Sequence, residues 1–276
     1  PSLVMPSILE ALAPVSSLLT AGAGIVPMSE GGKTFTTAAI NALPTAAWRA
    51  ENGSVSESDP TFRAVTATPR SLAFVVRVSR ELLADSPNLE PALRQAIAQA
   101  FAKELDRAGL RGTGTAPEPR GILNVAGIQA VGNGANGASL ASTAYTNLIS
   151  AIQSLLAADA PMPTAAIMAP RSLTTLGGLL DTTNQPRQRP DLLSNMRFIP
   201  TSQIPVNLTV GTSNDCTEIY VANFSRLFFL MREQMSVQLL TERYADSGQV
   251  GFLCHVRADV VVEYPAAFAV ITGVRA

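Results

Sequence analysis

The sequence predicts an α+β fold whose elements are too long to close into one compact body. Apolar and polar residues alternate without a break over residues 250–262, which is typical of a strand with one buried face. Large apolar residues recur every fourth position from Leu89 to Leu105, as on the buried face of a helix. Hydrophobic residues make up 47% of the chain and charged residues only 15%, against roughly 25% in an average soluble domain. We therefore expect contacts with other protein to bury much of the surface.

The first 33 residues are expected to form an extended arm, because they show no sustained helical period. Residues 11–28 carry no charge, but Pro14, Gly22, Gly24 and Pro27 interrupt them too often for a membrane-spanning helix. No basic leader is present, so a retained secretion signal is not expected. The chain begins at Pro1 without a methionine, as a processed product would.

Residues 34–80 are expected to form strands around a polar tip. Apolar residues alternate along residues 72–78 after a turn at Pro69. The tip spans residues 51–60, which are rich in Gly, Ser, Asn, Asp and Pro, and these residue types favour turns. This pattern predicts a long projecting hairpin.

The longest helix is predicted from the apolar repeat that begins at Leu89. Asp85 or Ser86 can cap it, Pro87 suits its first turn, and Gly109 is expected to end it.

The second half of the chain is expected to alternate helices and strands. A helix over residues 145–156 follows a cap at Ser142 or Thr143. A short buried strand at residues 165–168 precedes a third helix, which opens at Pro170 and carries Leu173, Leu176 and Leu180. A polar loop at residues 181–190 is expected to be exposed or interfacial. The alternating run over residues 250–262 would reach about 45 Å, and after a break at Pro265 residues 268–272 form a last strand.

Two glycine-rich segments resemble nucleotide-binding loops but lack their full pattern. Gly31-Gly32-Lys33-Thr34 matches the end of a phosphate-binding loop, yet Pro27 stands where that loop needs a glycine. Gly112-Thr113-Gly114 has no third glycine and follows a helix instead of a strand. A tight loop is the better interpretation of the second segment.

Histidine and cysteine chemistry is sparse. His255 is the only histidine, which excludes multi-histidine metal sites and leaves one candidate general base. Its neighbour Cys254 points to the opposite face of a strand, so the two cannot act together. We therefore expect a structural or interfacial histidine. Cys216 and Cys254 are too few for a disulfide scaffold; buried free thiols, and a reducing cytoplasm, are expected.

Several segments in order resemble the major capsid proteins of tailed bacteriophages with the Hong Kong 97 type fold. The hairpin tip matches at residues 50–51 and 57–62, and residues 79–86 match the approach to the long helix. Residues 112–124, Gly-Thr-Gly-Thr-Ala-Pro-Glu-Pro-Arg-Gly-Ile-Leu-Asn, match the family's glycine-rich loop. Each motif alone is weak, but their order fits along nearly the whole chain.

The resemblance implies a division into an arm, an extended loop, a peripheral domain with a long spine helix and long strands, and an axial domain. The arm would be residues 1–33 and the extended loop 34–71. The peripheral domain would hold residues 72–121 and 236–263, and the axial domain residues 122–235 and 264–276. Family members usually lose an N-terminal scaffolding segment to a phage protease.

The resemblance also implies a structural protein, neither an enzyme nor a carrier of a metal or cofactor. It would self-assemble into pentamers and hexamers of an icosahedral shell in a host bacterium's cytoplasm and end in the virion. The net charge of -1 fits packaged double-stranded DNA that is held without sequence recognition. A portal and a decoration or cementing protein would be further partners. The expected subunit-interface residues are Trp48, Arg49, Glu51, Glu57, Asp59, Arg63, Arg187 and Arg189.

Two alternatives remain at this point. An encapsulin is a nanocompartment shell of the same fold that binds enzyme cargo by short peptides. A hydrolase using His255 is a weaker alternative, because the pattern gives this histidine no partner on its strand face.

Some relatives lock their shells by an isopeptide bond between a lysine and an asparagine, promoted by a glutamate. The chain has only two lysines, Lys33 and Lys103, and neither lies at the hairpin tip. By alignment, Val55 replaces the lysine, His255 the glutamate, and Gly248 lies near the asparagine position. The sequence therefore predicts a shell without covalent crosslinks.

Overall fold

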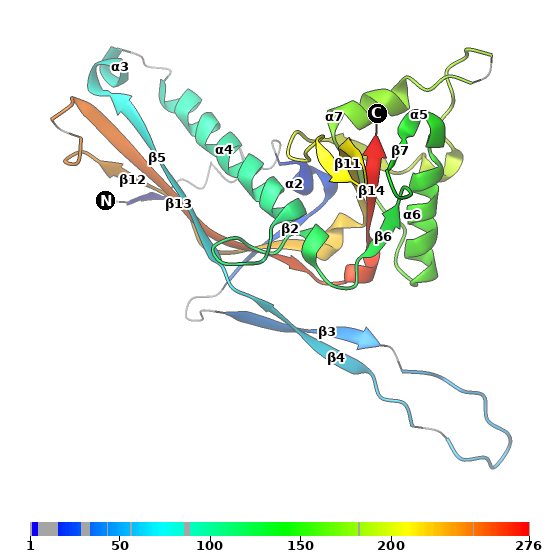
Figure 1. The fold of residues 1–276 in the computed structure, drawn as a ribbon. Coiled ribbons are helices and arrows are strands. Elements are labelled where there is room, and N and C mark those ends of the chain that lie inside the picture. Colours follow the sequence, from blue (N-terminus) through cyan, green and yellow to red (C-terminus); the bar gives the residue numbers. More distant parts are fainter. Residues whose placement is uncertain are drawn as a thin grey trace.

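The computed structural model describes residues 2–4, 16–28, 34–42, 44–55, 57–85, 89–181, 183–244 and 246–275. The fold is α+β, as predicted. It combines an elongated sheet with a long helix beside it, a compact sheet surrounded by shorter helices, and a two-stranded hairpin that projects away from both (Figure 1).

The elongated sheet is built on two 14-residue antiparallel strands, β12 (Leu227–Leu240) and β13 (Gln249–Val262). The second of them confirms the predicted late strand. β5 (Arg70–Ser79) pairs with β13, whereas β1 (Ser2–Val4) and β2 (Gly24–Pro27) pair with β12. Helix α4 (Leu89–Arg111) packs on this sheet, and the ring of its Phe101 lies 4.8 Å from that of Phe74 on β5. The apolar face of β5, which carries Phe74, is therefore turned to the long helix.

The compact sheet has the strand order β6-β14-β11-β8-β9, with β7 on β14 and β10 on β11. The predicted buried strand β8 lies inside it, with every residue buried. Helix α6 packs against β14 and β6. The strands are β6 (Gln129–Gly132), β7 (Ala138–Ser139), β8 (Ala165–Met168), β9 (Arg197–Pro200), β10 (Leu208–Val210), β11 (Ser213–Ala222) and β14 (Phe268–Arg275). The helices are α5 (Leu140–Thr143), α6 (Thr146–Ala157) and α7 (Pro170–Gly177). Single 3-10 turns are η1 (Ile122–Asn124), η2 (Asp191–Leu193), η3 (Phe224–Arg226) and η4 (Pro265–Ala267).

The projecting hairpin consists of β3 (Phe35–Ala42) and β4 (Thr61–Ala67), which pair only with each other in the described part of the chain. At its root, Ala67 is buried in a small apolar cluster with Met28, Leu230 and Val261. From Arg63 to Thr66, β4 runs beside the end of β13, and the part of the hairpin nearer its tip extends away from the body (Figure 1). The predicted projecting hairpin is confirmed.

The N-terminal segment differs from the predicted extended arm, because residues 16–28 belong to the body of the protein. Ser16 caps helix α2 (Ser17–Ala21) by accepting a hydrogen bond from the Leu19 N–H. Leu18 is fully buried against Gly109 of α4, where a Cβ would lie 2.5 Å from its Cδ1. A single helical turn is too short to show an apolar period, so the sequence pattern could not reveal it. Residues 5–15 and 29–33 of the expected arm lie outside the described residues.

Several predicted helix ends are wrong. Helix α4 runs through Gly109 to Arg111, because Leu18 fills the space beside that glycine and the backbone stays helical. Asp85 ends a separate short helix, α3 (Arg80–Asp85), and the alternative cap Ser86, like Pro87, lies outside the described residues.

The caps and ends of the later helices also differ. Ser142 and Thr143 do not cap α6 but lie inside α5, whose own cap is Ser139. Leu180 falls beyond the end of α7 and is exposed, because the helix closes at Gly177. The final strand β14 continues past residue 272 to Arg275, since it pairs with β11 and with β7 there.

Candidate assembly surfaces

The segment that joins β3 to β4, residues 44–60, contains the predicted tip 51–60 and is called the tip from here on; its described residues are nearly all exposed. Trp48 has its full side chain in solvent, with a relative exposure of 105%. Arg49 folds back within the tip and donates a hydrogen bond to the Gly53 carbonyl over 2.8 Å. The carboxylates of the tip are also exposed; they belong to Glu51, Glu57 and Asp59. A single chain thus leaves an aromatic side chain and several charges without cover at the end of a thin projection.

The root of the hairpin borders a cavity of about 380 Å³, which we call the root cavity. It lies between β4 and the last residues of β13, beside the glycine-rich loop. Arg63 and Arg70 line it from the hairpin side, and Arg120 lines it from the loop. The guanidinium of Arg63 donates to the Glu263 carbonyl over 3.0 Å, which fastens the hairpin to the body.

Asp259 is the buried acid of the root cavity. Its carboxylate accepts hydrogen bonds from the Thr68 N–H over 2.7 Å and from the Val260 N–H over 2.8 Å. Burial raises the pKa of Asp259, although these hydrogen bonds and the charges of Arg70 and Arg120 lower it in part. Asp259 therefore holds the bend between β4 and β5 by accepting from the Thr68 N–H.

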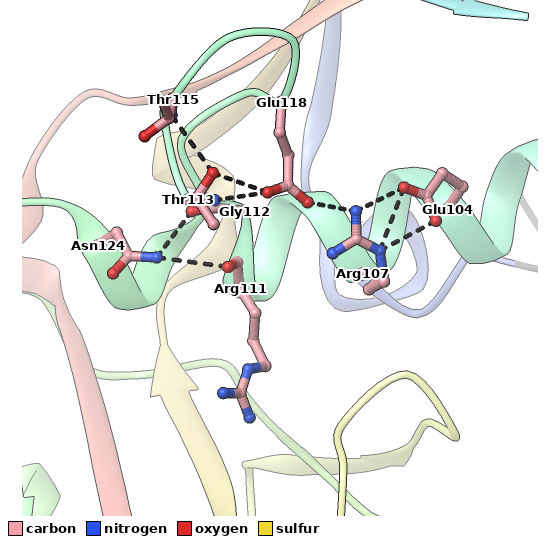
Figure 2. A network of polar contacts seen from close by, with 8 residues as sticks. All are labelled: Glu104, Arg107, Arg111, Gly112, Thr113, Thr115, Glu118 and Asn124. Carbon is pink, nitrogen blue, oxygen red and sulfur yellow. Dashed lines mark hydrogen bonds and ion pairs between the residues drawn. The ribbon is translucent and has the colours of Figure 1, made fainter.

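The glycine-rich loop after α4 is held by Glu118 (Figure 2). One oxygen of this carboxylate pairs with Arg107, and the other accepts hydrogen bonds from the N–H and the hydroxyl of Thr113. These contacts lower the pKa of Glu118, the backbone N–H of Thr113 contributing most. Asn124 closes the loop by donating to the carbonyl oxygens of Arg111 and Gly112. The predicted tight loop is confirmed, and it forms one wall of the root cavity.

Asp106 fixes the N-terminal segment to the long helix. Its buried carboxylate accepts hydrogen bonds from both the N–H and the hydroxyl of Ser17, over 2.6 and 2.8 Å. The Ser16 hydroxyl donates over 2.6 Å, and the Leu18 N–H over 3.3 Å. Burial raises the pKa of Asp106 more than these hydrogen bonds lower it.

The structure separates the expected interface residues into distinct places. Trp48, Arg49, Glu51, Glu57 and Asp59 lie together on the tip, whereas Arg63 lies at the root.

Arg187 and Arg189 lie on the far loop of the compact part. Arg187 is exposed, but Arg189 is engaged within the chain. Its guanidinium donates to the carbonyl oxygens of Leu193 and Met196 and stacks over the Phe198 ring at 3.9 Å. Sequence reasoning missed Arg70, Arg120 and Asp259, because they come from separate segments and only the fold brings them to one cavity.

His255 has a partner that the sequence argument did not foresee. Its Nε2 lies 2.8 Å from the hydroxyl of Ser71 on the neighbouring strand β5. The expectation that this histidine has no partner on its strand face is therefore wrong. The two residues are diagonal neighbours across the strands, since His255 is paired with Ala73. Cys254 is buried on the other face, as expected, and burial raises the pKa of its thiol to about 11.

Other site types find no support in the described residues. Both cysteines are free and buried there. No group of His, Cys, Asp and Glu in that part of the chain could hold a metal ion. Among the same residues, no helix is long and apolar enough to cross a membrane.

The chain resembles known capsid proteins along almost its whole length. The model of the phage capsid family matches residues 1–273. A solved capsid of a native GTA particle is similar with a TM-score of 0.73 at 18% identity, over 94% of this chain and 90% of that one. A structure from Mycobacterium phage Bobi gives 0.74 at 19% identity, over 95% and 91% of the two chains. One from Microbacterium phage Oxtober96 gives 0.68 at 19%, over 93% and 90%. No curated protein matches the sequence at a significant level.

These structures share too little sequence to show more than the fold, whereas the family model covers nearly every residue. The encapsulin alternative is not favoured, since the matched family is that of phage capsids. The fold is of the Hong Kong 97 type and the protein is a structural component of a virion capsid. The chain belongs to the phage capsid family.

Proposed function

We propose that this major capsid protein assembles into pentamers and hexamers that close an icosahedral shell around double-stranded DNA. The projecting hairpin is the observation that carries the proposal. Its strands β3 and β4 pair only with each other in the described residues, and Trp48 at its tip is fully exposed. An isolated two-stranded hairpin is at best marginally stable in water. A neighbouring subunit would supply the missing contacts.

The division of labour within the subunit is part of the proposal. The extended loop is residues 34–71, the peripheral domain 72–121 and 236–263, and the axial domain 122–235 and 264–276. Residues 1–33 are the proposed arm, except that α2 and β2 within this range pack as part of the subunit body. The tip residues and Arg63 are the proposed interface of the extended loop. Exposed Arg187 is the proposed interface of the axial domain, where Arg189 would support the loop from inside.

The further partners would be the packaged DNA, a portal and a decoration or cementing protein, with assembly in the cytoplasm of a host bacterium. A net charge of -1 supports DNA that is enclosed without specific recognition.

We also propose that the protein has no enzymatic activity. The Ser71 and His255 pair resembles a nucleophile with its base, but it lies in the middle of a strand ladder, and His255 does not line the hollow that Ser71 borders beside α4 and the glycine-rich loop. Esterase or peptidase activity that disappears on His255→Ala would contradict this part of the proposal.

Electron microscopy of the purified chain tests the main proposal. We expect closed shells of uniform size from the protein expressed alone or with its cognate assembly partners. Nuclease protection of the DNA inside mature particles would test the packaged cargo. Monodisperse subunits under all these conditions would contradict the proposed function.

A further inference from the structure

We propose that the carboxylates Glu51 and Glu57 of one subunit's hairpin tip dock into the root cavity of a second copy. The inference rests on the proposed shell assembly and names both surfaces of one contact. The root cavity is the arginine-lined space between β4, β13 and the glycine-rich loop.

The tip carries an excess of negative charge. Residues 44–60 contain Arg49 against the carboxylates of Glu51, Glu57 and Asp59. The arginine is held by the Gly53 carbonyl, and no described residue forms an ion pair with any of the three carboxylates. The tip thus carries three exposed carboxylates without ion pairs among the described residues, and it stands on a projection that has no cover of its own.

The root cavity carries the opposite charge. Arg63, Arg70 and Arg120 line it together with two carboxylates, Asp259 and Glu118, and Glu118 is already paired with Arg107. Within the described residues, the guanidinium groups of Arg70 and Arg120 make no hydrogen bond or close ion pair, although both act on Asp259 at longer range. Asp259 itself is turned to backbone N–H groups. Two guanidinium groups therefore remain available for a carboxylate, which they can bind through paired hydrogen bonds.

The backbone around the cavity is also open. β5 pairs with β13 only as far as Ala258, opposite Arg70. The next residues, Asp259 to Val262, pair with β12 on one side and have no strand partner on the other among the described residues. β4, which bounds the cavity opposite them, pairs only with β3. With a volume of about 380 Å³, the cavity falls in the size range of binding pockets and can admit side chains of an incoming segment.

The acids must come from another copy, because β4 separates them from the cavity. This strand has seven residues and spans about 23 Å at 3.3 Å per residue. Glu57 precedes it and Arg70 follows it, so the two cannot meet in one chain while the strand is straight. The tip and the root cavity are two different surfaces of one chain, so their contact is head-to-tail. Contacts of this kind close into rings, such as pentamers and hexamers, when the rotation between copies closes.

Zero-length crosslinking tests the contact in intact shells. The Arg120→Lys variant keeps the positive charge, and a water-soluble carbodiimide joins a lysine amine to a touching carboxylate with loss of water, which the reagent takes up. The background is low, because the chain has only two lysines. We expect covalent oligomers in which mass spectrometry joins position 120 to Glu57 or Glu51. Dissociated Arg120→Lys subunits should lack this linkage. The Arg197→Lys variant is the control for an exposed lysine elsewhere, on β9, and it should form no linkage to Glu57 or Glu51. Intact Arg120→Lys shells that lack it would overturn the inference.

Charge reversal gives a second, independent test. Glu51→Arg with Glu57→Arg should reduce the yield of shells at least tenfold, and Arg120→Glu should weaken assembly in the same direction. Combining Arg120→Glu with the two tip reversals should restore most of the yield. Normal shells from the single reversals, or no recovery in the combination, would overturn the inference.

The same variants also show whether the cavity binds a carboxylate of another subunit or a phosphate group of DNA. Arginine variants that form normal shells but lose packaged DNA would assign the arginines to phosphate groups, which overturns the contact between copies. A wild-type chain that forms no shells would overturn the proposed function together with the inference.

Discussion

Gly112 and Gly121 bring their backbones into direct contact at the base of the glycine-rich loop. The Gly121 N–H donates to the Gly112 carbonyl over 2.9 Å. A Cβ on Gly112 would lie 2.3 Å from the Pro119 carbonyl oxygen, and one on Gly121 would lie 2.3 Å from the Gly112 nitrogen. The two ends of the loop can therefore come this close only because Gly112 and Gly121 have no side chain.

Replacing either glycine should destabilise the subunit. We expect Gly112→Ala or Gly121→Ala to lower the free energy of unfolding by about 1–3 kcal/mol, because backbone atoms must move apart to admit the methyl group. Urea denaturation of the unassembled subunit measures this. Gly177→Ala is the matched control, since nothing lies within 4 Å of a Cβ at that position. Equal stability of all three variants would contradict the prediction.

Asp106→Asn should lower stability by an amount that depends on pH. The pKa of Asp106 is raised above 3.8 by burial, so the folded state disfavours the ionised form. The contribution of this group is greatest below pH 3.8 and declines as pH rises through its folded pKa. The stability gap between wild type and Asp106→Asn should therefore be widest at acid pH and narrow as pH rises.

Urea denaturation across a pH series measures this gap. Asp181→Asn is a control whose pH dependence should have the opposite sign. Hydrogen bonds lower the pKa of Asp181, so the contribution of its carboxylate to the free energy of unfolding is lost as pH falls. An Asp106 gap that widens as pH rises would show that the sign is wrong.

The thiol of Cys254 should be inert in the native subunit. Burial raises its pKa to about 11, so almost none is thiolate at pH 8. A disulfide reagent at pH 8 should therefore label Cys254 only after denaturation. Mass spectrometry of a Cys216→Ser variant isolates this thiol, and rapid native labelling would contradict the expectation.

Deleting residues 52–58 should leave a soluble subunit that assembles poorly. The deletion removes tip residues that have few contacts with the body, so the melting temperature of the subunit should change little. Gradient sedimentation measures the yield of shells. Normal shells with normal heat stability would show that the tip makes no contact of importance.

Mature shells should separate into single chains when boiled in detergent. By the resemblance, Val55 would occupy the tip position where relatives with crosslinks carry a lysine, and without a nucleophilic amine no amide can form there. A denaturing gel should show one band. A ladder of oligomers that survives reductant would refute the prediction.

The elements that could be predicted from sequence are those with a long period. β13 shows alternation over residues 250–262, and α4 shows apolar spacing from Leu89 to Leu105, so local pattern alone predicted their type. The short α2 has no such period, and what stabilises it is Asp106, ninety positions away from Ser16.

The tip could be predicted from the sequence, whereas the root cavity could not. The tip is one continuous segment of polar residues, so its charges could be recognised together. Arg63, Arg70 and Arg120 come from separate segments, and only the bend between β4 and β5 places them around Asp259. The pair of His255 and Ser71 likewise depends on strand register, which the sequence of one strand does not contain.

The long strands β12 and β13 are joined to the compact sheet only at one of their ends. β12 starts after η3 and β13 ends before η4, and these turns join directly to β11 and β14, which pair with each other at Ala222 and Phe268. A force on the far ends of β12 and β13, at Leu240 and Gln249, therefore acts over about 45 Å as a torque on one pair of neighbouring strands. A rotation at the two 3-10 turns η3 and η4 would therefore change the angle between the two sheets while the strand pairing inside each sheet stays intact.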